Sequence, residues 1–200
     1  FAISLSGNLD ISILEQAISQ IISRHEILRT VFLSIDGKPG QLVNEPEPYS
    51  LEITELEDDA TAIEEALLRR ASTAFDLSNG PLMAIKLYKH SVKSFTLAIV
   101  KHHIISDGWS CSVFLRELTM AYNALLNNTE IPLSPLAVQY IDYANWQRNY
   151  VASEEVDKQV EYWKNKLSDI PQKLELPLII LVQTPKAMSE IESVLSSAKN

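Results

Sequence analysis

Two adjacent histidines and a nearby aspartate are the residues of this sequence best suited to acid–base chemistry. His102 and His103 lie at the end of a nearly continuous apolar run, and Asp107 follows after a short loop. An imidazole has an unperturbed pKa of about 6.5, so it can accept or donate a proton around neutral pH. Because neighbouring side chains of a strand point to opposite faces, one histidine of the pair can face a given cleft. The residues alone leave open which one does.

The segment 102–110 has the sequence HHIISDGWS and is predicted to join a strand to a helix that begins at about Trp109 or Ser110. Unpaired backbone N–H groups at such a helix start can orient a carbonyl or stabilise a developing oxyanion. Asp107 also has a plainer interpretation, as the N-cap of the helix. A buried pair of adjacent histidines is likewise often structural. The sequence leaves a catalytic and a structural interpretation open for both the histidine pair and Asp107.

Other kinds of site have weaker support. His103 and Asp107 are four residues apart, but Gly108 and the strand end argue against one helical face, and no third metal ligand has suitable spacing. Cys111 is expected to be a small buried helix residue rather than a nucleophile, and Ser110 lacks a Gly-x-Ser-x-Gly frame. With only five glycines, the chain has no glycine-rich phosphate loop. We therefore expect no metal and no bound cofactor.

A second polar group lies at 24–32, with the sequence RHEILRTVF, where a helix passes into a strand. Arg24 and Arg29 bracket it. An arginine near a helix C-terminus complements the helix dipole, and Glu26 offers a local partner. The alternative is a long-range ion pair, in which an arginine meets Asp107 in the interior, because a buried carboxylate needs such a partner to stay charged.

Strands and helices are interspersed along the chain that must position these residues. The hydrophobic patterns predict strands at 1–5, 28–35, 41–44, 51–56, 82–88 and 95–101, and helices at about 11–22, 58–74, 109–126, 138–150 and 154–167. Asp10 is expected to cap the first helix. The apolar run 95–100 is typical of a strand that is covered on both faces. The class is therefore α/β or α+β.

The composition is that of a folded chain, with 46% hydrophobic and 22% charged residues. A net charge of −9 argues against nucleic acid, whose phosphates need clustered Lys and Arg. No apolar run approaches the roughly 20 residues that span a bilayer, and the start of the chain lacks a signal-peptide pattern. A single cysteine excludes an intrachain disulfide. We expect a cytoplasmic protein that binds neither nucleic acid nor membrane.

Three motifs together resemble the condensation domains of nonribosomal peptide synthetases, which belong to the chloramphenicol-acetyltransferase-like superfamily. The family pattern HHxxxDG is met at 102–108, and Trp109 and Ser110 continue it in the usual way. The pattern RHExLRTxF is met at 24–32, and YxDYAxW is met at 140–146. A lone HHxxxDG is shared across the superfamily, whereas three motifs in order are far more specific.

This resemblance implies the N-terminal lobe of a two-lobed fold, with the active site in a tunnel between the lobes. Each lobe would be a mixed sheet packed with helices, in a two-layer sandwich. The implied reaction is amide formation, in which the amine of an acceptor aminoacyl thioester attacks a donor thioester. Both substrates would arrive on phosphopantetheine arms of peptidyl-carrier protein domains, next to an adenylation domain. The chain itself would then need no cofactor.

The resemblance also implies a role for each motif residue. His103 would be the active-site histidine, which positions the amine with modest base character, since an α-ammonium has a pKa of about 8. His102 and Asp107 would shape the loop, with Arg24 as the charge partner of Asp107. Gly108 would let the backbone approach the substrate closely. Further structural support would come from Arg29, Trp109 and Ser110.

The two ends of the chain lead to a further expectation. We assign 1–177 to the N-terminal lobe and 178–200 to a divergent tail, where an apolar stripe at helical spacing predicts a short helix. The C-terminal lobe is expected to be absent, so the isolated lobe is expected to be incomplete or inactive. Two alternatives therefore stay open: a stand-alone acyltransferase of the same superfamily, and a non-catalytic lobe that binds a carrier protein or a partner chain.

Overall fold

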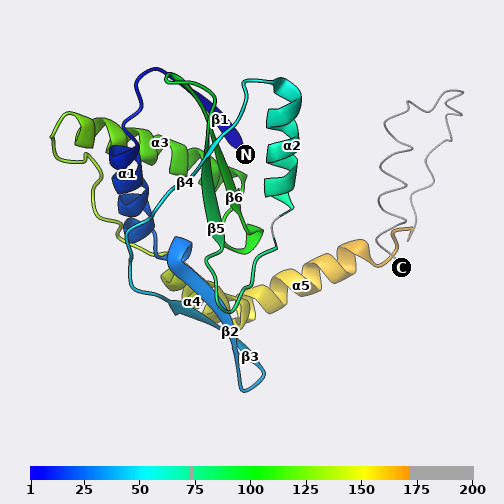
Figure 1. Ribbon diagram of the computed structural model, residues 1–200. Coiled ribbons are helices and arrows are strands. Elements are labelled where there is room, and N and C mark those ends of the chain that lie inside the picture. The colour runs from blue at the N-terminus through cyan, green and yellow to red at the C-terminus, as the bar shows by residue number, and fades with distance from the viewer. Residues whose placement is uncertain (73, 172–200) are drawn as a thin grey trace, which may run out of the picture. The chain divides into compact units, whose positions relative to one another are not determined.

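The computed structural model of the protein describes residues 1–72 and 74–171 (Figure 1). The chain divides into two units, Phe1–Val151 and Ala152–Asn200. The first unit contains every described strand and the residues with candidate chemistry. In the second unit, the described part is mainly one helix, α5 (Glu154–Leu167). The predicted tail at 178–200 lies outside the described residues.

A four-stranded sheet in the order β1-β6-β5-β4 forms the centre of the first unit. The strands β1 (Ala2–Ser6) and β5 (Met83–Lys89) both pair antiparallel with β6 (Ser94–Lys101), whereas β4 (Glu52–Glu55) is parallel to β5. The prediction of a mixed sheet is thereby confirmed. Since β6 is an inner strand and ends directly before His102, the predicted catalytic segment starts from the middle of the sheet.

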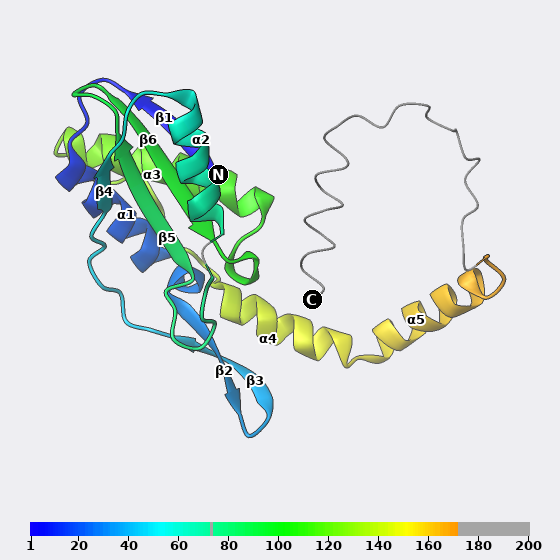
Figure 2. The same cartoon turned by 45° about the vertical axis from the view of Figure 1, so that its right-hand side comes forward.

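Two helices, α1 (Ile11–Arg24) and α3 (Gly108–Leu126), pack against each other on one face of this sheet (Figures 1 and 2). The carboxylate of Asp10 accepts a hydrogen bond of 3.0 Å from the Ile13 amide, which confirms the predicted N-cap of α1. Ile18 and Ile21 of α1 are fully buried in one core with the sheet. Each such side chain contributes about 1.5–3 kcal/mol by leaving water.

A third helix, α2 (Ala60–Ala71), covers part of the opposite face. Leu97 and Ile99 of β6 join the core beneath α1 and α3, whereas Ala98 packs with Ala66 of α2. This alternation confirms that β6 is covered on both faces, as its apolar sequence predicted. By the same alternation, Lys101 falls on the face of α1 and α3.

A separate hairpin follows α1, as the sequence predicted. It consists of β2 (Thr30–Ile35) and β3 (Lys38–Val43), joined by a turn in which Asp36 and Gly37 have positive φ. The predicted strand at 28–35 starts later than expected, because Glu26–Arg29 form a short 3-10 helix, η1. The Thr30 hydroxyl donates a hydrogen bond of 2.7 Å to the Glu26 carbonyl and so closes this turn.

The remaining helices follow the periodicity of the sequence closely. After a loop comes α4 (Tyr140–Val151), and α5 occupies the predicted range 154–167. The first turn of α5 carries Glu154 and Glu155, and its last turn carries lysines, which complements the helix dipole. Among the described residues, no helix is long and apolar enough to cross a membrane.

Candidate active site

The segment 102–110 turns sharply between β6 and α3. The His102 amide donates a hydrogen bond of 2.9 Å to the Leu82 carbonyl, which extends the strand pairing by one residue. His103–Ile105 then form a short 3-10 turn, η2. Because Ile105 is 4% exposed and packs into the main core, it holds this turn against the body of the lobe.

The two adjacent histidines have different surroundings. The Nδ1 atom of His102 accepts a hydrogen bond of 3.1 Å from the Ile104 amide, and its ring stands edge-on to Phe75, with 6.2 Å between the centroids. His103 is exposed, and its ring makes no hydrogen bond to another described residue. Strand alternation does not separate the pair, because β6 ends before both. It is the turn that engages His102 and leaves the ring of His103 free.

Asp107 is the N-cap of α3, as the plainer interpretation predicted. Its Oδ1 accepts hydrogen bonds of 2.8 Å from the Ser110 amide and 2.6 Å from the Ser110 hydroxyl. The Ser110 hydroxyl in turn accepts from the Asp107 amide, at 3.4 Å, and completes a capping box. The bonds from Ser110 hold the pKa of Asp107 below its ordinary value, and the charge of His103 acts weakly in the same direction.

The predicted ion pair between Arg24 and Asp107 is wrong. Arg24 donates from Nε to Glu117 Oε2 at 3.1 Å, and Glu117 is 5% exposed, whereas Asp107 is exposed. Glu117 lies about 15 Å farther along α3 than Asp107, at 1.5 Å per residue. The buried acid that faces the end of α1 is therefore Glu117, while Asp107 is engaged in capping the helix.

His25 is a second partner of Glu117 that the sequence reasoning missed. Its Nε2 lies 2.7 Å from the same Oε2 atom. Glu117 has the spacing of the buried face of α3, together with Phe114 and Leu118. An acid on an apolar helix face seldom stays buried without a partner, and this pattern was the available signal.

The third motif is joined to the same place by Gln139, the residue directly before it. Its side chain accepts a hydrogen bond of 3.2 Å from the Glu26 amide and donates one of 2.9 Å to the Arg24 carbonyl. The backbone N–H of Gln139 donates a hydrogen bond of 2.9 Å to Asp142 Oδ2, at the start of α4. We call the cluster of Arg24, His25, Glu26, Glu117 and Gln139 the arginine corner.

Arg29 supports the neighbouring turn rather than the segment 102–110. It donates to the Asn44 carbonyl, just after β3, and its Nη2 lies 3.6 Å from Glu26 Oε1. These interactions tie η1 to the hairpin. The local pairing between Arg29 and Glu26 agrees with the plainer interpretation of the motif.

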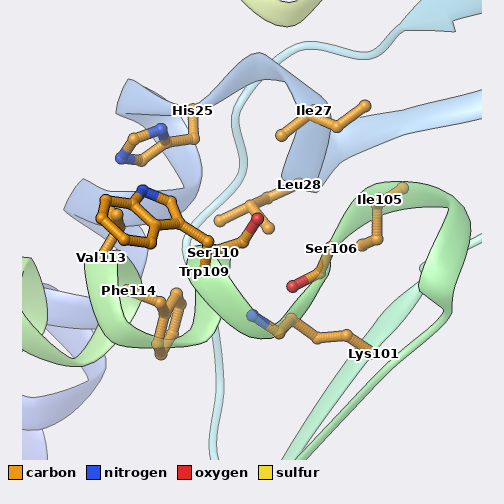
Figure 3. Close-up of a pocket in the computed structure, with 10 residues that line it drawn as sticks. All are labelled: His25, Ile27, Leu28, Lys101, Ile105, Ser106, Trp109, Ser110, Val113 and Phe114. Atoms are coloured by element: carbon orange, nitrogen blue, oxygen red, sulfur yellow. The ribbon is translucent and has the colours of Figure 1, made fainter.

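A pocket of about 140 Å³ lies between the segment 102–110 and the arginine corner (Figure 3). His25 lines one part of it, and Trp109 and Ser110 line another. The motif at 24–32 therefore reaches this pocket through His25, Ile27 and Leu28 rather than through an arginine. Trp109 is 81% exposed, and a Cβ atom added to Gly108 would meet nothing within 4 Å. The surface at the start of α3 is thus open, and packing does not demand a glycine there.

Metal chemistry finds no support in this part of the chain. Among residues 1–72 and 74–171, no group of three or more His, Cys, Asp or Glu side chains is arranged to hold a metal ion.

Comparison with known proteins decides the family. The sequence profile of the Condensation domain family matches residues 1–196. The chain belongs to the condensation domain family. This membership agrees with the fold, because the condensation lobe consists of a mixed sheet packed with helices, as the resemblance predicted.

Curated relatives of this condensation domain are much longer proteins. It is 38% identical over 182 residues to a linear gramicidin synthase of Brevibacillus parabrevis, covering 88% of this chain and 2% of the relative. Malpinin synthetase from Mortierella alpina is 36% identical over 179 residues, with the same coverage. The chain thus spans a few per cent of these relatives.

Solved structures resemble the lobe closely. The complex of the X-domain and OxyB from teicoplanin biosynthesis matches with a TM-score of 0.79 and 31% identity, over 88% of this chain and 39% of that one. The epimerization domain from the third module of tyrocidine synthetase B matches with a TM-score of 0.73 and 26% identity, over 88% and 41%. The chain therefore corresponds to less than half of each solved chain.

Replacing Asp107 by Asn isolates the charge of the N-cap, since Asn caps helices about as well. Because the folded pKa of Asp107 is lowered, its charge stabilises the fold above the unfolded pKa of about 3.9, and this contribution is lost as the pH falls through the folded pKa. The Tm of the wild type should exceed that of the variant at pH 7, and the difference should shrink toward zero in acid. A difference that is independent of pH in thermal unfolding would contradict this assignment.

Replacing Glu117 by Ala should lower the free energy of unfolding by about 3–4 kcal/mol, because Arg24 loses its buried carboxylate partner and His25 loses a hydrogen-bonding partner. The lower part of the usual range applies because the side chains of Arg24 and His25 retain 17% and 20% exposure. Equilibrium urea unfolding measures the change. The control is Glu65→Ala, which breaks the exposed pair with Arg69 and should cost about 0.5 kcal/mol or less. Equal effects of the two variants would refute the buried role.

Proposed function

We propose that this lobe carries the catalytic loop for peptide-bond formation in nonribosomal peptide synthesis. The amine of an acceptor aminoacyl thioester attacks the carbonyl of a donor thioester, both held on phosphopantetheine arms of carrier proteins. An N–C bond forms, the C–S bond breaks, and the leaving thiolate takes up a proton. The observation that carries the proposal is the exposed ring of His103, at the end of the central strand of a condensation-domain lobe.

The two histidines would have separate roles. His103 accepts a hydrogen bond from the attacking amine and takes up its proton as the N–C bond forms, a role that histidine side chains commonly fill in general acid–base catalysis. His102 holds the turn, since its Nδ1 is already engaged by the Ile104 amide. The Ser110 amide is engaged by Asp107, so it is not one of the donors available to a tetrahedral oxyanion.

The proposed partners follow from the length of the known relatives. The chain spans 39% and 41% of the two solved structures compared above, which supports a second lobe as the other wall of the active site. Donor and acceptor carrier proteins and an adenylation domain complete the proposal, in the cytoplasm. The solved X-domain is in complex with OxyB, which supports a capacity of such domains to engage protein partners.

Replacing His103 by Ala should abolish or greatly slow peptide formation while the fold is retained. A loss of about 100-fold or more is expected for a residue that transfers a proton and positions the amine. The protein that carries this segment, in its natural length, is given donor and acceptor thioesters on their carrier proteins. Single-turnover product formation is then followed by mass spectrometry.

His90→Gln provides the matched control. His90 bonds to the Leu56 carbonyl and the Thr96 hydroxyl, away from the segment 102–110. Turnover per folded molecule should stay near the wild-type value in this variant. Near-wild-type turnover of the His103→Ala protein, with the control also active, would overturn the assignment of His103.

A further inference from the structure

The last residue of β6 is a lysine on a face that is otherwise apolar. Lys101 continues the row of Leu97 and Ile99, which point into the core beneath α1 and α3. Its ammonium lies 5.1 Å from the centroid of the Phe114 ring and 5.6 Å from that of Phe1. The charged group is therefore held between two aromatic faces, next to the segment that carries the histidines.

This ammonium lacks a carboxylate partner. Among the described residues, no Asp or Glu oxygen forms an ion pair with Lys101, and Asp107, whose charge acts on Lys101, caps α3 instead. Burial lowers the pKa of Lys101, while the neighbouring Cys111 side chain, through its charge and a hydrogen bond, and the charge of Asp107 act in the opposite direction. A lysine that shields apolar surface usually extends its ammonium into bulk water. Here the lysine lines a pocket instead.

The pocket combines the Lys101 ammonium with the polar side chains of His25 and two serines, and the rest of its wall is mainly apolar. It encloses about 140 Å³, and its walls include Leu28, Ile105 and Val113. Figure 3 shows the Lys101 ammonium and the Ser106 hydroxyl directed toward the same space. Such a pocket complements a small ligand that is anionic at one end and apolar along the rest.

We propose that this pocket is a binding subsite for a carboxylate on a short aliphatic chain, with Lys101 as its cationic partner. The Ser106 hydroxyl is an additional hydrogen-bond donor once it exchanges its long bond of 3.5 Å to the Asp107 carbonyl for the ligand. A charge-assisted hydrogen bond inside a partly desolvated pocket is stronger than one at the open surface. Inorganic phosphate suits the pocket less well, because its larger charge would have to be desolvated against mostly apolar side chains.

The position of the pocket gives this subsite a role in substrate selection, and this role rests on the proposed function. Ser106, Trp109 and Ser110 belong both to the pocket and to the segment that carries His103. A substrate whose carboxylate meets Lys101 would therefore have its remaining atoms held beside that segment. The subsite selects an acidic side chain on one of the two joined residues.

Binding is tested without any turnover, by titrating the 200-residue chain with butyrate and, separately, with its uncharged isostere butyramide. Amide signals of the lysine and of the serines that line the pocket should shift saturably in nuclear magnetic resonance spectra. Butyrate should bind about tenfold more tightly than butyramide, as expected for a charged over a neutral hydrogen-bonding partner. Butyramide that binds as tightly as butyrate, or butyrate that leaves the pocket signals unmoved, overturns the proposal. So does phosphate that binds more tightly than butyrate.

Three variants connect the preference to one side chain. Lys101→Met should bind the two probes equally, Lys101→Arg should restore the preference for butyrate, and Lys93→Met, which removes an exposed lysine, should leave the preference unchanged. If the Met variant unfolds, as circular dichroism would show, the Arg variant and the wild-type probe comparison still decide. A preference that survives in folded Lys101→Met contradicts the proposal.

Turnover separates this proposal from the function on which it rests. In single-turnover assays, glutamyl thioester should be preferred over glutaminyl thioester by the wild type, at the donor or the acceptor position, and the preference should be lost in Lys101→Met. Butyrate binding without any peptide formation would contradict peptide-bond formation and retain the subsite. Peptide formation without a Lys101-dependent preference would contradict the subsite and retain the function.

Discussion

The buried carboxylate of Glu117 anchors α3, the helix that follows the predicted catalytic segment, to the rest of the lobe. A single oxygen of this side chain lies within hydrogen-bonding distance of both Arg24 and His25. Arg24 also donates to the Ser134 carbonyl at 2.6 Å, and Gln139 binds the backbone on both sides of His25. The interaction is well placed to fix geometry, because a buried charge without its partners is costly. The motif at 24–32 and the start of α4 are thus joined to α3, the helix that follows the segment 102–110.

The position of the exposed histidine depends on this anchoring. The segment 102–110 is held at its start by the pairing of β6 and at its end by the capping box that starts α3. If α3 could shift along α1, the cap would move with it, and so would the turn η2. With α3 fixed, the turn engages the ring of His102 and leaves that of His103 exposed. Apart from His25, which lines the pocket, the arginine corner therefore supports the candidate site without entering it.

Periodicity predicted the elements because it reports local burial. The alternation along 95–101 and the helical spacing after Asp10 each depend on one face packing on the core, and both features are confirmed. The ion pair of Arg24 was predicted wrongly, because its partner lies 93 residues away and the sequence does not show which acid near α3 faces α1. Capping, a local interaction, engaged Asp107, while helix geometry placed Glu117 toward α1. The pocket at Lys101 also escaped prediction, since it depends on how η1, β6 and α3 meet.

The most direct test of the central claim is a double-mutant cycle on Arg24 and Glu117, with the free energy of unfolding as the readout. Arg24→Met, Glu117→Gln and the double variant are compared with the wild type by urea denaturation. Residues in direct contact in such a pair should show a coupling energy of about 1–3 kcal/mol. Additivity within about 0.5 kcal/mol would mean that the two side chains act independently, and would contradict the account of a carboxylate that fastens α3 to the arginine motif.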